Sequence, residues 1–89
     1  MEYSYPISMD WSVEEIISVI NFFEIIEKVY KQGVNRKEMM AHYRKFKKVV
    51  PSIAEEKKIF REFQEMSGYL AYHAVKMMKE SKDTDMIRL

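Results

Sequence analysis

Two pairs of adjacent glutamates and two histidines are the side chains best suited to acid–base or metal chemistry. They are Glu14–Glu15, Glu55–Glu56, His42 and His73. Neighbours on a helix point about 100° apart, so neither glutamate pair converges on one substrate, as a general acid and base must. Neither histidine is followed by a carboxylate or a second histidine at the third or fourth position, the spacing of a helical metal site. The sequence therefore predicts no catalytic residue, no metal ion and no cofactor.

A basic run is the other candidate for binding chemistry. Its members are Arg36, Lys37, Arg44, Lys45, Lys47 and Lys48. A nucleic-acid surface needs such cations for phosphates and exposed aromatic rings for base stacking. Tyr43 and Phe46 lie within the run, but their helical spacing places both on the side expected to face the core. A solvated basic face is the favoured interpretation, while RNA or DNA binding and contact with an acidic protein remain open.

Charge is unevenly distributed along the chain, although the net charge is only +1 over 89 residues. Residues 1–30 carry a net charge of −5, residues 31–48 carry +6, and the remainder balances to zero. Such asymmetry indicates an anionic partner, or an acidic helix packed beside a basic one.

Length and composition indicate one small helical domain. Two glycines and two prolines leave little material for the turns of an all-β fold, and the lack of cysteine excludes disulfides and thiolate metal sites. The first ten residues lack the basic start and apolar core of a signal peptide. The longest charge-free apolar run, residues 16–23, falls short of the roughly 20 residues that span a bilayer. We therefore expect a cytoplasmic protein with no membrane span.

Periodicity and capping signals predict four helices that position these residues. The first helix, residues 12–32, begins with a capping box of Ser12 and Glu15 and ends before Gly33, which tolerates a left-handed cap. Apolar side chains cover most of its circumference, a pattern typical of a central helix wrapped by others. The remaining helices are expected over residues 36–50, 53–66 and 69–80.

The other capping signals and the two termini complete the predicted fold. Asn35 with Glu38 and Ser52 with Glu55 resemble two further capping boxes. Residues 1–10, with Tyr3, Tyr5 and Ile7 alternating, read as an extended arm, and residues 81–89 as a frayed tail. The expected fold is all-α: one compact four-helix domain over residues 1–80, with helix 1 central and a short extended N-terminal arm.

An ordered set of motifs resembles the YktA-like family of small bacterial proteins from Bacillus and its relatives. The motifs are Tyr3 to Pro6, Asp10-Trp11-Ser12 with Glu14-Glu15, Tyr43-Arg44 with Phe46-Lys47, Val50-Pro51-Ser52, Ala54 to Lys57, and Ser67-Gly68-Tyr69. The likeness covers nearly the whole chain except the last ten residues. It implies a small helical cytoplasmic protein and carries over no activity or functional residue.

Two functions from different classes follow from these patterns. The first is a non-catalytic protein-interaction module that self-associates, because three short helices offer limited cover for so apolar a first helix. Its partner would be an unknown protein or a second copy. The alternative is a nucleic-acid-binding accessory protein that uses the basic face of the second helix.

Overall fold

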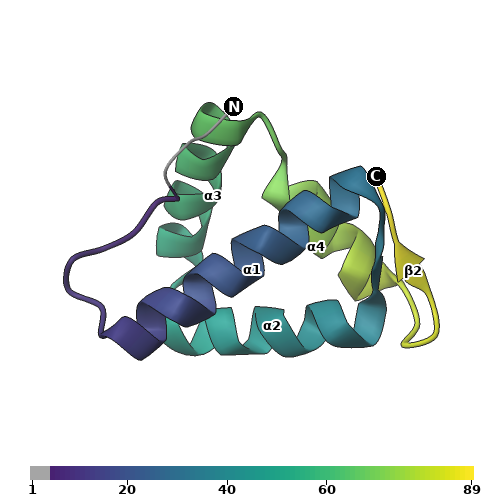
Figure 1. The fold of residues 1–89 in the computed structure, drawn as a ribbon, viewed down its shortest axis with the longest axis horizontal. Helices are drawn as coiled ribbons and strands as arrows, with labels where there is room; N and C mark the ends of the chain where they lie inside the picture. The colour runs from purple at the N-terminus through teal and green to yellow at the C-terminus, as the bar shows by residue number, and fades with distance from the viewer. Residues whose placement is uncertain (1–4) are drawn as a thin grey trace.

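Four helices and one short two-stranded sheet follow one another along residues 5–89, the part of the chain that this computed structural model describes (Figure 1). The elements are α1 (Val13–Lys31), β1 (Val34–Asn35), α2 (Arg36–Val49), α3 (Ile53–Ser67), α4 (Ala71–Glu80) and β2 (Met86–Ile87). The prediction of a predominantly α-helical fold with four helices is confirmed. No helix within residues 5–89 is both long and apolar enough to cross a bilayer.

The five phenylalanines of the sequence meet in one core against α1. Phe22 and Phe23 of α1 are fully buried, as are Phe46 of α2 and Phe63 of α3. The ring centroids of Phe22 and Phe46 lie 4.5 Å apart, and those of Phe23 and Phe63 lie 4.3 Å apart. Phe60 of α3 stacks on Phe22 at 5.9 Å. Since α1 also contacts α4 and β1, it is the central helix, as its apolar pattern predicts (Figure 1).

Burial of α1 is incomplete at its N-terminal end. The side chain of Val13 is 74% exposed and that of Ile17 is 51% exposed, so the expectation of nearly all-round burial is wrong there. The described part of the arm, residues 5–10, packs elsewhere. The Tyr5 ring stacks on Phe23 at 5.9 Å and lies 6.1 Å from Phe63 of α3. Tyr3 of the predicted arm lies outside the described residues.

The predicted starts of α1, α2 and α3 agree with the structure, although only one capping box is complete. The Ser12 hydroxyl accepts from the Glu15 amide at 3.1 Å, and the Glu15 carboxylate accepts from the Ser12 amide at 2.8 Å. Asn35 caps α2 and Ser52 caps α3 through their side-chain oxygens. In both caps the side chain of the cap residue accepts hydrogen bonds from helix amides. The side chains of Glu38 and Glu55, each in the third position of its helix, do not accept a hydrogen bond from the cap amide in return, so these two capping boxes are incomplete. Local hydrogen bonding thus fixes where α1, α2 and α3 begin.

The start of α4 is set by tertiary contact instead of a local cap. The helix begins at Ala71, two residues later than predicted, and its cap residue Leu70 supplies no side-chain hydrogen bond. The Tyr30 hydroxyl donates to the Leu70 carbonyl oxygen at 2.9 Å. The ring of Tyr30 also stacks on Tyr69 with centroids 5.0 Å apart. These contacts tie the α3–α4 connection to the C-terminal half of α1.

Residues 81–89 fold back onto the segment between α1 and α2. β2 pairs antiparallel with β1, with Val34 opposite Ile87. The Ile87 side chain is fully buried in the core, and the Leu89 amide donates to the Val29 carbonyl oxygen at 3.1 Å. The prediction of a frayed tail is therefore wrong. The polar residues that suggested fraying form a turn. This turn returns the chain to the core, where the side chain of Ile87 is buried.

Candidate interaction groove

The six cations of the predicted basic surface divide into two groups, and Arg36 and Lys47 form the first. Arg36 Nε donates to the Met78 carbonyl oxygen at 2.9 Å, and its guanidinium forms an ion pair with Asp83. Lys47 Nζ lies 2.5 Å from a carboxylate oxygen of Glu56 on α3. These two residues connect elements of the fold, and their charges are paired within it. They therefore do not belong to a continuous basic surface.

The second group, Lys37, Arg44, Lys45 and Lys48, lies exposed on α2. Among the residues that the structure describes, none of these four side chains has an ion-pair partner. The neighbouring aromatic rings are not available for stacking, because Tyr43 is only 7% exposed and Phe46 is fully buried. As predicted, these rings face the core. The remaining basic surface offers cations alone.

A groove lies where α2, α3 and α4 meet, and most of the residues that line it lie outside the basic run. Its deeper part has a volume of about 410 Å³ and lies between Tyr43, Phe60 and the backbone turn at Pro51. Two large apolar side chains border it while remaining largely in solvent: Ile53 is 69% exposed and Tyr72 is 58% exposed. An apolar floor with exposed apolar edges is typical of a contact surface.

The groove continues between α3 and α4 as a second depression of about 360 Å³. Lys57, Phe60 and Tyr72 line both parts, so the two depressions are contiguous. Leu70 and Ala71 extend the apolar floor, and Arg61 adds a second cation to the rim beside Lys57, one helical turn away. We refer to both depressions together as the α2–α3–α4 groove.

A polar network crosses the deeper part of the groove. The Tyr43 hydroxyl donates to Glu56 Oε2 at 3.1 Å, while Glu56 Oε1 accepts from Lys47. Lys79 of α4 places its ammonium 5.4 Å from the centroid of the Tyr43 ring, within cation–π range. Burial, together with the charge and the hydrogen bond of Glu56, raises the pKa of Tyr43 to about 12. Tyr43 therefore stays protonated at neutral pH and acts as a donor.

The network determines the charge of the groove. Glu56 is matched by Lys47, so its carboxylate does not offset the cations further out. Lys57 and Arg61 on α3 and Lys79 on α4 remain on the rim, where no described carboxylate pairs with them. The groove is consequently apolar at its floor and positively charged at its edge.

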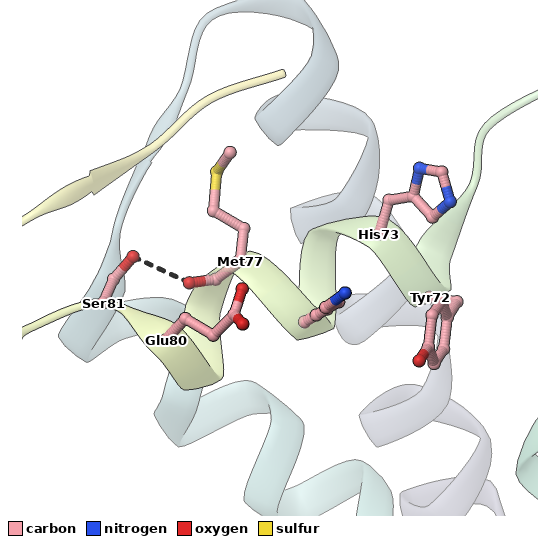
Figure 2. A pocket seen from close by; sticks show the side chains of 6 residues that line it. Tyr72, His73, Met77, Glu80 and Ser81 are labelled. Atoms are coloured by element: carbon pink, nitrogen blue, oxygen red, sulfur yellow. Dashed lines mark hydrogen bonds between the residues drawn. The ribbon is translucent and has the colours of Figure 1, made fainter.

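The outer side of α4 has a shallower depression, and its polar groups do not converge. Figure 2 shows His73 and Tyr72 at one end and Glu80 and Ser81 at the other. The Ser81 hydroxyl is occupied, since it donates to the Met77 carbonyl oxygen at 2.7 Å. The arrangement brings no base beside a nucleophile.

The other residues considered for chemistry are also dispersed. Glu15 caps α1 and Glu56 belongs to the groove network, whereas Glu14 and Glu55 are exposed. Across residues 5–89, no three histidine or carboxylate side chains come together in a way that could hold a metal ion.

Comparison with known proteins places the chain in a family. Residues 2–87 match the family model described as UPF0223, an uncharacterised protein family. The chain belongs to the UPF0223 family. A UPF0223 protein of Lysinibacillus sphaericus is 57% identical over 89 residues, which cover all of this chain and 94% of the relative. A UPF0223 protein of Bacillus mycoides is 48% identical over 89 residues, which cover both chains completely.

Membership in UPF0223 confirms the resemblance to small uncharacterised proteins of Bacillus and its relatives. A further UPF0223 protein, from Oceanobacillus iheyensis, is 52% identical over 86 residues, covering 97% of this chain and 98% of that protein. The similarity reaches the C-terminal strand, beyond the limit that the sequence motifs suggested. The UPF0223 description assigns no substrate, partner or residue role.

Proposed function

We propose that this protein is a non-catalytic protein-interaction module, and that its α2–α3–α4 groove receives an apolar segment of a partner that also carries acidic side chains. The observation that carries the proposal is that exposed Ile53 and exposed Tyr72 line the same depression as buried Phe60. A central aromatic pocket bordered by exposed apolar and aromatic side chains is the usual arrangement of an interaction hot spot.

The rim charges support an acidic partner. Lys57, Arg61 and Lys79 border the apolar floor, and Glu56 is already matched within the fold. Charge complementarity at such a rim accelerates association and selects among partners, while the apolar floor supplies most of the contact. An acidic segment with apolar side chains on one side satisfies both requirements.

Site-specific photo-crosslinking in the native cells tests this proposal. A photoreactive amino acid replaces Tyr72 in the groove and, as the matched control, Lys28 on the exposed side of α1. We expect one partner to be captured at position 72 and not at position 28. We also expect capture to be lost in the variant Lys57→Glu/Arg61→Glu, whose circular dichroism should match that of the wild type because both residues are exposed. Identical capture at both positions, or capture that survives the charge reversal, would contradict the proposal.

Nucleic-acid binding through α2 is the second candidate. Its support is the set of exposed cations Lys37, Arg44, Lys45 and Lys48, and its weakness is the burial of the neighbouring rings. The test is fluorescence anisotropy with single- and double-stranded RNA and DNA over a salt series. Phosphate-driven binding weakens steeply with salt and should disappear in Arg44→Gln/Lys45→Gln/Lys48→Gln. It should persist in a control variant that replaces three exposed lysines outside α2, Lys58→Gln/Lys76→Gln/Lys82→Gln.

Two further parts of the proposal concern where the module acts and with what. A cytoplasmic location is favoured by the lack of cysteine, since small extracellular domains commonly depend on disulfides. Self-association would fill the groove without a second kind of protein.

A further inference from the structure

The N-terminal end of α1 and the turn before it form an exposed surface that is both apolar and acidic. Met9, Val13 and Ile17 recur every four residues, and all three are more than half exposed. Asp10 and Glu14, each next in sequence to one of them, are also exposed. We call these five residues the acidic end. Exposed apolar side chains at successive turns, flanked by carboxylates, are the kind of surface that an interaction partner covers.

The acidic end and the α2–α3–α4 groove are complementary in charge and in polarity. The acidic end carries the carboxylates of Asp10 and Glu14, and the rim of the groove carries Lys57 and Arg61 on α3. The apolar pair Val13 and Ile17 matches the apolar floor around Phe60 in polarity. Within one chain, no hydrogen bond or ion pair among the described residues joins the two surfaces, so both are open to a second molecule.

We propose that the groove of one copy of this protein receives the acidic end of a second copy. This proposal rests on the proposed function and names the occupant of the same groove. Val13 and Ile17 pack onto the apolar floor, and the carboxylates of Asp10 and Glu14 face the rim cations Lys57 and Arg61. The contact joins two different surfaces, so a pair of copies still has one free groove and one free acidic end, and further copies can add unless the assembly closes into a ring.

Charge alone does not hold the two copies together. Lys45 and Lys48 of the same chain border Glu14 in a shallow depression between α1 and α2, which reduces the net negative potential of the acidic end. The apolar side chains therefore supply most of the binding free energy, and the charges orient the contact. Higher salt should weaken the association without abolishing it.

Sedimentation velocity over a wide concentration range tests the proposal. For the wild type, we expect the mass to rise with concentration beyond that of a dimer, or to reach a closed ring, and the rise to shift to higher concentration in high salt. The acidic-end variant Val13→Asn/Ile17→Asn and the groove variant Ile53→Asn/Tyr72→Asn should each remain monomeric, because each removes the apolar contacts of one surface. All four residues are exposed, so both variants should fold as the wild type does.

Mixing the two variants provides the decisive measurement. The acidic-end variant has an intact groove and the groove variant has an intact acidic end, so one productive contact remains between them. The mixture should form a complex of one chain of each and nothing larger. The control variants Met86→Asn and Lys58→Gln/Lys76→Gln change exposed residues outside both surfaces and should assemble as the wild type does.

A wild type that stays monomeric at every concentration would overturn the self-association proposal, as would a mixture that yields no complex. Photo-crosslinking at position 72 then distinguishes a wrong occupant of the groove from a wrong proposed function. If a partner of another kind is still captured in a groove-dependent manner, only the identity of the occupant is wrong. If no groove-dependent capture occurs, the proposed function falls as well.

Discussion

The Tyr43 hydroxyl donates a hydrogen bond to Glu56 Oε2 at 3.1 Å and so links α2 to α3 across the floor of the groove. The same carboxylate accepts from Lys47 through its other oxygen. One acidic side chain therefore satisfies two donors of α2, and the groove keeps a fixed shape where these helices meet. Both the stability of this corner and its response to pH depend on the Tyr43–Glu56 contact.

Alkaline pH should destabilise the protein through Tyr43. Its folded-state pKa of about 12 lies above the ordinary value of 10.0 because burial and the Glu56 carboxylate disfavour the phenolate. Between these values the folded state holds a proton that the unfolded state has lost, so stability falls as pH rises through this window. Urea unfolding at pH values on either side of 10 should show a steeper loss for the wild type than for Tyr43→Phe. Equal losses would contradict the role given to Tyr43.

The same substitution has an effect at neutral pH. Tyr43→Phe removes one hydrogen bond to a charged acceptor and should lower the free energy of unfolding by about 1.5–3 kcal/mol. Tyr72→Phe is the matched control, because Tyr72 is exposed and should change stability little. Urea denaturation of both variants at pH 7 provides the measurement.

The aromatic core should be sensitive to truncation at its centre. Phe22 is fully buried and stacks on Phe46 and Phe60, so Phe22→Ala should cost about 3–5 kcal/mol of unfolding free energy. Val13→Ala, on the same helix but exposed, should cost far less. Thermal unfolding monitored by circular dichroism compares the two variants. A similar loss of stability in both would contradict the prediction that the buried Phe22 ring contributes far more than the exposed Val13 side chain.

The C-terminal strand should contribute to stability in spite of its polar surroundings. Ile87 is fully buried opposite Val34, so Ile87→Ala should cost about 2–5 kcal/mol. Met86 is exposed in the same strand, and Met86→Ala should be nearly neutral. Chemical denaturation tests this pair, and a neutral Ile87→Ala would mean that residues 86–87 do not hold the fold together.

The two glycines with positive φ should differ in their response to alanine. Gly33 has φ +93°, and an added Cβ would lie 3.3 Å from the Arg88 side chain, whereas Gly68 has φ +82° and open space around it. Both substitutions incur the backbone cost of placing alanine at positive φ, about 1 kcal/mol. Gly33→Ala should be the more destabilising in thermal unfolding because Arg88 and β2 must also shift.

Local features of the sequence determined where α1, α2 and α3 begin. Ser12 and Glu15 are three residues apart, and Gly33 directly follows the last turn of α1, so the hydrogen bonds that begin and end this helix involve neighbours in sequence. The spacing of Tyr43 and Phe46 likewise predicted their burial, because helical periodicity alone assigns residues to a face.

Tertiary structure decided the role of each charged residue and of the C-terminal segment. In sequence, Arg36 and Lys47 resemble their neighbours in the basic run. In the structure, Arg36 forms an ion pair with Asp83, and Lys47 forms one with Glu56. Ile87 follows a polar stretch, and only its pairing with Val34 buries it. These contacts join residues 9 to 53 positions apart, and whether such pairs form depends on how the helices pack. Local propensity and periodicity carry no information about that packing.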